Sequence, residues 1–205
     1  MTETQPTRGY SATAKALHWL TVAALAAQFW VGYTMDADAS SDNAVDAAKE
    51  AEKAAKDAAY PDEAGEEAAE EAAKAAVDAA KDHNYVVGTG DGIDALELHV
   101  GLGALILVLG IARVTHRRLA GLPPWAPRLS ARARTIATRS EQLLLLSLFT
   151  IPISGLALVL TGNDDLVPLH VGAHVGFFAA LAVHLGNVVW HTVLRRHGLL
   201  RRMLP

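Results

Sequence analysis

The sequence predicts an all-α integral membrane protein, a four-helix bundle with an acidic helical insert between its first two membrane spans. Three observations support this fold class. Hydrophobic residues make up 51% of the 205 residues, and several apolar runs are long. Charge is also segregated, because 18 acidic residues, five lysines and no arginine lie between Asp36 and Glu97. Such segregation is typical of a membrane protein whose two faces meet different compartments.

Four stretches reach the ~20 apolar residues that a helix needs to cross a bilayer. They are residues 14–35, 96–116, 142–162 and 168–194. The first is longer than the ~7–15 apolar residues of a cleavable signal peptide, and no small-residue cleavage site follows it. We therefore expect it to be retained as a span.

Basic residues gather at one set of span ends. By the positive-inside rule, the N-terminus, the loop between the second and third spans, and the C-terminal tail should be cytoplasmic. The residues concerned are Arg8, Lys15, Arg117, Arg118, Arg128, Arg132, Arg134, Arg139, Arg195, Arg196, Arg201 and Arg202. Four spans with both termini inside give a consistent count, and the acidic insert then faces outside.

The chain is expected to have three parts. Residues 1–35 hold the N-terminus and the first span, residues 36–95 the insert, and residues 96–205 the other spans with their basic loop and tail. The insert is rich in Ala, Glu and Lys, which favour helix. It is broken at Tyr60–Pro61 and Gly65, which predicts two short helices folded as a hairpin. Two interpretations remain open: a solvated, partly disordered excursion, or a docking surface for a basic or metal-bearing partner.

Histidines provide the strongest functional signal. Ionisable side chains within membrane spans are costly and usually mark function. Six histidines lie within or at the edge of the predicted spans: His18, His99, His170, His174, His184 and His191. The chain has no cysteine, which excludes disulfides, iron–sulfur clusters, thiolate nucleophiles and covalent haem attachment. A haem would therefore be held non-covalently, with His or Met as axial ligands.

The spacing of the histidines favours two haems. His170 and His184 are 14 residues apart, which places them on one helix face about 21 Å from each other at ~1.5 Å per residue. This separation suits two cofactors stacked in opposite leaflets and is too long for a shared metal ion. Depth pairs His18 with His184 near the inner side, and His99 with His170 near the outer side. His174 is an alternative to His170 as the outer ligand.

Four segments resemble the prokaryotic cytochrome b561 family of small, four-span, di-haem inner-membrane cytochromes. They are RGYSATAKALHW at 8–19, LHVGLGALILVLGIARVTHR at 98–117, PISGL at 152–156 and the ending LLRRMLP. The related hydrogenase-type cytochrome b subunits are a more distant match. The resemblance implies His18, His99, His170 and His184 as the haem-iron ligands, electron exchange with quinone and, as in one member type, superoxide oxidation at the outer surface.

The chain also departs from that family. The acidic insert is not typical of it, and Arg139-Ser140-Glu141 stands where members often carry a histidine early in the third span. A quinone site would need a polar group at membrane depth, for which Gln28, Ser147, Ser154 and Asn187 are candidates. Arg113 and Arg195 would pair with haem propionates or serve as topology anchors.

We therefore expect a multi-pass protein of a prokaryotic plasma membrane. It would carry electrons with two b-type haems and would use quinone as its redox substrate. Electrons would pass between the quinone pool and a donor or acceptor at the outer face. Superoxide oxidation coupled to quinone reduction is one alternative, and a membrane anchor subunit or a His-lined metal or proton transporter is another. Expected partners are lipid, quinone and an extracytoplasmic redox protein or small oxidant or reductant at the insert, but no nucleic acid. Whether the chain is an enzyme or a homodimer stays open.

Overall fold

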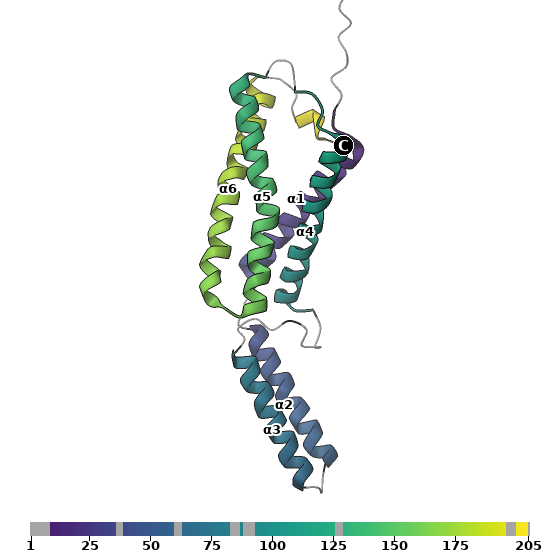
Figure 1. Cartoon of the computed structure of the whole chain (residues 1–205), viewed down its shortest axis with the longest axis vertical. Helices are drawn as coiled ribbons and strands as arrows, with labels where there is room; N and C mark the ends of the chain where they lie inside the picture. Colours follow the sequence, from purple (N-terminus) through teal and green to yellow (C-terminus); the bar gives the residue numbers. More distant parts are fainter. Residues whose placement is uncertain are drawn as a thin grey trace, which may run out of the picture. The chain divides into compact units, whose positions relative to one another are not determined.

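The computed structural model describes residues 9–35, 39–59, 63–82, 87, 93–125, 129–195 and 200–204. Every regular element among these residues is a helix, so the predicted all-α class is confirmed. Arg8, Arg128 and Arg196, which were counted for orientation, lie outside the described residues. The six long helices are α1 (Ala12–Thr34), α2 (Ala39–Ala59), α3 (Glu63–Asp82), α4 (Ala95–Ala120), α5 (Ala131–Thr161) and α6 (Val167–Val189) (Figure 1). Three short helical turns complete them: η1 (Asp164–Leu166), η2 (Trp190–Leu194) and η3 (Leu200–Arg202).

Three helical segments in the described part of the chain are long and apolar enough to cross a membrane. They are Ala95–Ala120, Ala131–Thr161 and Asp164–Leu194, which match the last three predicted spans. Helix α1 has 23 residues and is not among these three segments. Crossing by α1 therefore stays a prediction.

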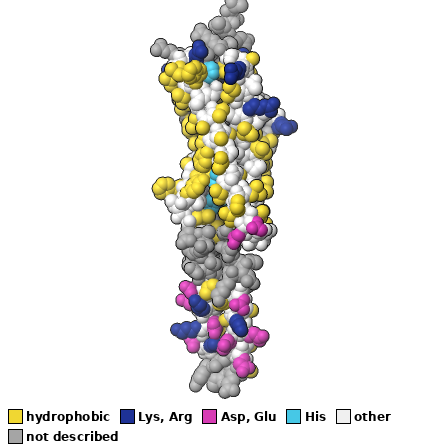
Figure 2. All heavy atoms as spheres, turned by 90° about the vertical axis from the view of Figure 1, so that its left-hand side faces the viewer, with side chains coloured by type: hydrophobic (Ala, Val, Ile, Leu, Met, Phe, Trp, Pro, Cys, Tyr) yellow, Lys and Arg dark blue, Asp and Glu magenta, His cyan; other side chains and the backbone are white. Residues whose placement is uncertain are grey.

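Large apolar side chains on these helices point outward. Leu160 and Val175 are 73% and 71% exposed, and hydrophobic side chains cover much of the visible face of the span helices (Figure 2). In water this surface would be strongly unfavourable, whereas hydrocarbon solvates it and the helical backbone satisfies its own hydrogen bonds. The distribution is that of an integral membrane protein.

The chain divides into two compact units, each described by itself. Unit 1 comprises Met1–Ala26, Gly103–Ser154 and Pro168–Pro205, and unit 2 comprises Ala27–Leu102 and Gly155–Val167. Unit 1 thus holds most of α1, α4, α5 and α6. Unit 2 holds the end of α1, the helices α2 and α3, the start of α4 and the end of α5.

The core of unit 1 joins three helices. Ala24 of α1, Ile106 of α4 and Leu148 of α5 form a buried cluster. A Cβ at Gly110 would lie 3.2 Å from Cβ of Leu148 and 3.3 Å from Cζ of Phe149, so α4 and α5 approach closely there. Small residues at such crossings are a common way of packing membrane helices.

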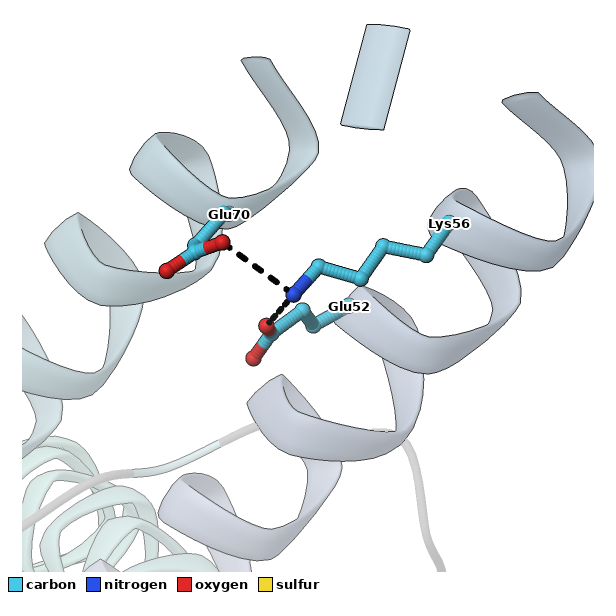
Figure 3. Close-up of polar contacts among 3 residues, drawn as sticks. All are labelled: Glu52, Lys56 and Glu70. Carbon is cyan, nitrogen blue, oxygen red and sulfur yellow. Dashed lines mark hydrogen bonds and ion pairs between the residues drawn. The ribbon is translucent and has the colours of Figure 1, made fainter. Parts of the chain in front are cut away.

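Helices α2 and α3 form the predicted hairpin in unit 2 (Figure 1). The side chain of Lys56 bridges them, with Nζ 2.8 Å from a carboxylate oxygen of Glu52 on its own helix and 3.4 Å from one of Glu70 on α3 (Figure 3). The prediction of a break at Gly65 was wrong, because Gly65 lies inside α3. A single glycine costs a helix only about 1 kcal/mol, and the surrounding Ala and Glu offset that.

Candidate functional site

Both members of the first predicted ligand pair lie in unit 1. His18 of α1 and His184 of α6 are both partly buried and lie close enough for their charges to interact. Arg113 of α4 and Glu141 of α5 also act electrostatically on His184. Nδ1 of His18 is buried and has no hydrogen-bond partner. A buried polar nitrogen without a partner is costly, so this ring nitrogen is suited to a ligand that the protein alone does not supply.

Trp19 fixes the surroundings of His18. Its indole packs edge-to-face against the His18 ring, with centroids 5.3 Å apart and planes at 80°. Nε1 of Trp19 donates a hydrogen bond of 2.8 Å to the carbonyl oxygen of Met203. Nearby, Nζ of Lys15 donates a hydrogen bond to the carbonyl oxygen of Leu204. The C-terminal residues are therefore fastened to the start of α1, directly beside His18.

His170 of α6 is held in one tautomer. Its Nδ1 lies 3.1 Å from the carbonyl oxygen of Ile151 and 3.0 Å from Oγ of Ser154, both on α5 in unit 1. A carbonyl oxygen can only accept, so Nδ1 carries the proton and the lone pair is on Nε2. Metal-bound histidines commonly donate their other ring N–H to an acceptor in this way. His174 packs against His170 with ring centroids 5.0 Å apart, and it is buried.

His99 of α4 lies in unit 2 against the end of α1. The amide nitrogen of Gln28 is 3.2 Å from Nδ1 and 3.1 Å from Nε2 of His99, and Gln28 is 7% exposed. A Cβ at Gly32 would lie 2.6 Å from Cε1 of the same ring. Since Gln28 contacts Nε2, binding of a metal by that atom requires the Gln28 amide or the His99 ring to turn.

His99 and His170 belong to different units, so their pairing stays a prediction, as does the choice between His170 and His174. The other histidines lie elsewhere. Nε2 of His116 lies 3.4 Å from Oγ of Ser11. His191 is buried and, with Asn187, lines a cavity between α5 and α6. His197 lies outside the described residues.

Charged groups surround the end of unit 1 that holds His18. Arg117 and Glu141 form an ion pair of 2.7 Å, and Arg202 lies over the ring of Tyr10 at 6.0 Å. Burial raises the pKa of Tyr10 above its ordinary value, and the charge of Glu141 raises it further. This end of the bundle therefore combines several arginines with one partly buried carboxylate.

The donor set fits haem better than a bare metal ion. No group of three or more His, Asp or Glu side chains that could hold a metal occurs in the described ranges. A haem iron needs only two axial ligands from the protein, because the porphyrin supplies the rest. The Nε2 lone pair of His170 has the chemistry that such ligation needs, and the unpartnered Nδ1 of His18 marks a second buried imidazole whose hydrogen bonding the protein does not complete.

Comparison with known proteins decides the family. A family model described as prokaryotic cytochrome b561 matches residues 9–205. The chain belongs to the prokaryotic cytochrome b561 family. This cytochrome b561 is thus an integral membrane protein that binds b-type haem and transfers electrons. Neither the search of curated proteins nor that of solved structures found a match.

Several residues of this cytochrome have roles that the sequence did not indicate. Gln28 and Ser154 were candidates for a quinone site as polar groups at membrane depth, but they contact His99 and His170. Gly32 and Trp19 were not singled out. Gly32 could have been found by its position one helical turn after Gln28, which places both on the same face of α1.

Proposed function

We propose that this cytochrome b561 holds two haems and carries electrons across the membrane, between the quinone pool and a donor or acceptor at its outer face. The observation that carries the proposal is that His18 and His184 lie in the same unit, near enough for their charges to interact, with a buried His18 nitrogen that lacks a partner. The second haem rests on His99 and on His170, which lies 14 residues before His184 on α6, about 21 Å away at ~1.5 Å per residue and so in the opposite leaflet.

His18 and His184 would hold the iron of the inner haem. Arg113 lies close enough to both for its charge to act on them. A guanidinium at this point suits the propionate groups of a haem, because an opposite charge in a low-dielectric setting is a strong partner. Glu141 is held by Arg117, so one carboxylate in the same region is already paired.

His99 and His170 would hold the iron of the outer haem. The Ile151 carbonyl and Ser154 fix the His170 ring before any cofactor arrives, so little reorganisation is needed at that ligand. His99 needs more rearrangement before it can bind iron, because Gln28 contacts both of its ring nitrogens. For Nε2 to hold iron, the Gln28 amide would move away from it, and Gln28 Oε1 would accept the Nδ1–H of His99.

Ligation by two histidines supports electron transfer rather than chemistry at the iron. Haem held by two histidines would supply one-electron redox chemistry and would leave no iron position for a substrate. The protein then sets the potential through hydrogen bonds to the ligand histidines and through burial. Quinone is the redox partner that the bilayer itself supplies.

The charge of the acidic hairpin α2–α3 favours one kind of redox partner at the outer face over another. Exposed acidic side chains gather over α2 and α3 (Figure 2). Such a surface repels an anion such as superoxide and attracts a cationic small molecule or a basic protein. We therefore rank quinone-linked electron exchange with a cationic or protein partner above superoxide oxidation.

The test is haem stoichiometry in the purified protein, from reduced-minus-oxidised spectra and pyridine haemochrome assays. We expect about two b haems per chain, and loss of one in each of His18→Ala, His99→Ala, His170→Ala and His184→Ala. His116→Ala is the matched control, because His116 lies at a helix end beside Ser11, and it should keep both haems. A single haem in the unaltered protein would overturn the two-haem proposal, and loss of haem in His174→Ala but not in His170→Ala would exchange the outer ligand.

A further inference from the structure

A cavity of about 820 Å³ lies between the start of α5 and the end of α6, extending to η2, all within unit 1. From α5 and the residue before it, the cavity is lined by Ser130, Arg132, Ala133 and Ile136. From α6 and the residues after it, the lining is Val183, Gly186, Asn187, Trp190, His191 and Arg195. None of the proposed haem ligands is among these residues, and neither α1 nor α4 contributes.

The cavity is open to its surroundings along exposed apolar side chains. Ile136 is 38% exposed, and Val183 and Trp190 are each 50% exposed. A haem held between α1 and α6 would lie among those helices, whereas this cavity is built by α5 and α6 alone. Exposed apolar side chains at the cavity suit an occupant that carries an apolar chain.

The lining is polarised along its length. Two arginines, Arg132 and Arg195, stand at the end nearest the start of α5, where Ser130 Oγ caps the helix by accepting from the Ala133 N–H at 3.2 Å. The guanidinium of Arg195 lies over the Trp190 ring at 5.9 Å, which holds its charge at the cavity. The other end of the lining is apolar. An anionic group is expected at the arginines, because two cations and a helix N-terminus act there together.

We propose that this cavity is a binding site for an anionic phospholipid, with its phosphate between Arg132 and Arg195 and an acyl chain along Ile136 and Val183. Asn187 and the buried His191 supply polar groups between the two regions. A neutral quinone headgroup would not need two arginines. A zwitterionic lipid carries its own cation to the same place and gains less from them.

The experiment is native mass spectrometry of the haem-loaded protein in detergent, titrated with phosphatidylglycerol or with phosphatidylcholine. We expect one tightly retained phosphatidylglycerol per chain and weaker retention of phosphatidylcholine. The double variant Arg132→Gln/Arg195→Gln should bind phosphatidylglycerol roughly thirtyfold more weakly, since each basic residue near a membrane surface contributes about 1 kcal/mol. The matched control is Arg118→Gln/Arg139→Gln, which removes the same charge at exposed positions outside the cavity and should leave retention unchanged.

Three results would overturn this site. Equal retention in the double variant and the control would show that the arginines bind no headgroup. Displacement of the lipid by inorganic phosphate alone would make the cavity a free-anion site. Loss of haem from the double variant, measured in the same samples, would assign the arginines to haem propionates. Because the lipid is counted separately from the haem, failure of the two-haem proposal would leave this test intact.

Discussion

A Cβ atom at Gly32 would lie 2.6 Å from Cε1 and 2.9 Å from Nδ1 of His99. The His99 imidazole therefore rests directly on the backbone of α1, where any other residue would displace it. Gln28, one helical turn earlier, contacts the same ring through its amide nitrogen. These two residues of α1 together fix where the His99 side chain can lie.

The first prediction concerns Gly32→Ala. Because real Cβ contacts essentially never fall below 3.0 Å, the His99 ring must turn away from α1, and it would then no longer present its nitrogen at the same point. We expect haem content to fall from about two to about one per chain, with helix content unchanged. Pyridine haemochrome assays and circular dichroism measure the two quantities.

The matched control is Gly110→Ala. It also adds a methyl group at a crowded helix position, but the contacts are with Leu148 and Phe149 rather than with a histidine. This variant should keep both haems while losing about 1–3 kcal/mol of stability through overpacking. Equal haem loss in both variants would mean that Gly32 acts through general packing and not through His99.

The second prediction concerns Ser154→Ala. Oγ of Ser154 donates to the Ile151 carbonyl at 2.9 Å and so accepts the Nδ1–H of His170 at 3.0 Å. Accepting that proton makes the imidazole a stronger donor to ferric iron, which lowers the potential. Its removal leaves the Ile151 carbonyl as the remaining acceptor, so the midpoint potential of one haem should rise by less than the ~20–60 mV equivalent of one net hydrogen bond.

Potentiometric titration of the haem spectra measures the effect of Ser154→Ala. Ser147→Ala is the control, because Ser147 lies on the same helix and its Oγ donates to the Leu143 carbonyl at 2.9 Å. The control should leave both midpoint potentials unchanged. A downward shift in Ser154→Ala, or none, would remove Ser154 from the tuning of that haem.

Hydropathy predicted the membrane part of each helix but not the whole helix. The third span was expected at residues 142–162, whereas α5 begins at Ala131. Its first turns, ARARTIATRS, contain Ala and Arg, which favour helix but are too polar for a membrane core. A transfer scale therefore marks where hydrocarbon ends, and the backbone continues as helix into the interface.

The ligand candidates were visible in the sequence because an ionisable residue in a span has few structural uses. Their supporting contacts were not visible. Whether Gln28 meets His99 depends on which face of α1 turns toward α4. That choice follows from the packing of side chains in three dimensions, and the uniformly apolar composition of the spans carries little information about it.

The third prediction concerns Trp19→Phe. The substitution keeps an aromatic ring beside His18 but removes the N–H that donates to the Met203 carbonyl. We expect loss of about 1 kcal/mol of stability, typical of one hydrogen bond, and faster proteolytic removal of the C-terminal residues. Thermal unfolding and limited carboxypeptidase digestion measure these effects. Trp30→Phe, at a position 74% exposed, is the control and should change neither.

The fourth prediction concerns the ionisation of Tyr10, which lies before the start of α1. Burial and then the charge of Glu141 raise the pKa of Tyr10, while Arg202, Arg117 and Arg113 oppose them. An unfolded tyrosine has a pKa of about 10. Because the folded pKa is higher, the protonated phenol contributes stability that is fully present below about pH 10. That contribution is lost as the pH rises through the folded value.

Absorbance at 295 nm, taken as the difference between the unaltered protein and Tyr10→Phe, isolates this titration. We expect its midpoint above pH 10, together with a fall in the unfolding temperature over the same range. Glu141→Gln removes the negative charge that raises the pKa of Tyr10 and should move the midpoint down. The same substitution breaks the ion pair between Glu141 and Arg117. The positive charge of Arg117 is then no longer offset by a carboxylate, so it favours the Tyr10 phenolate more strongly and shifts the midpoint in the same direction. A midpoint that rises or stays fixed in Glu141→Gln would show that Glu141 does not act on Tyr10.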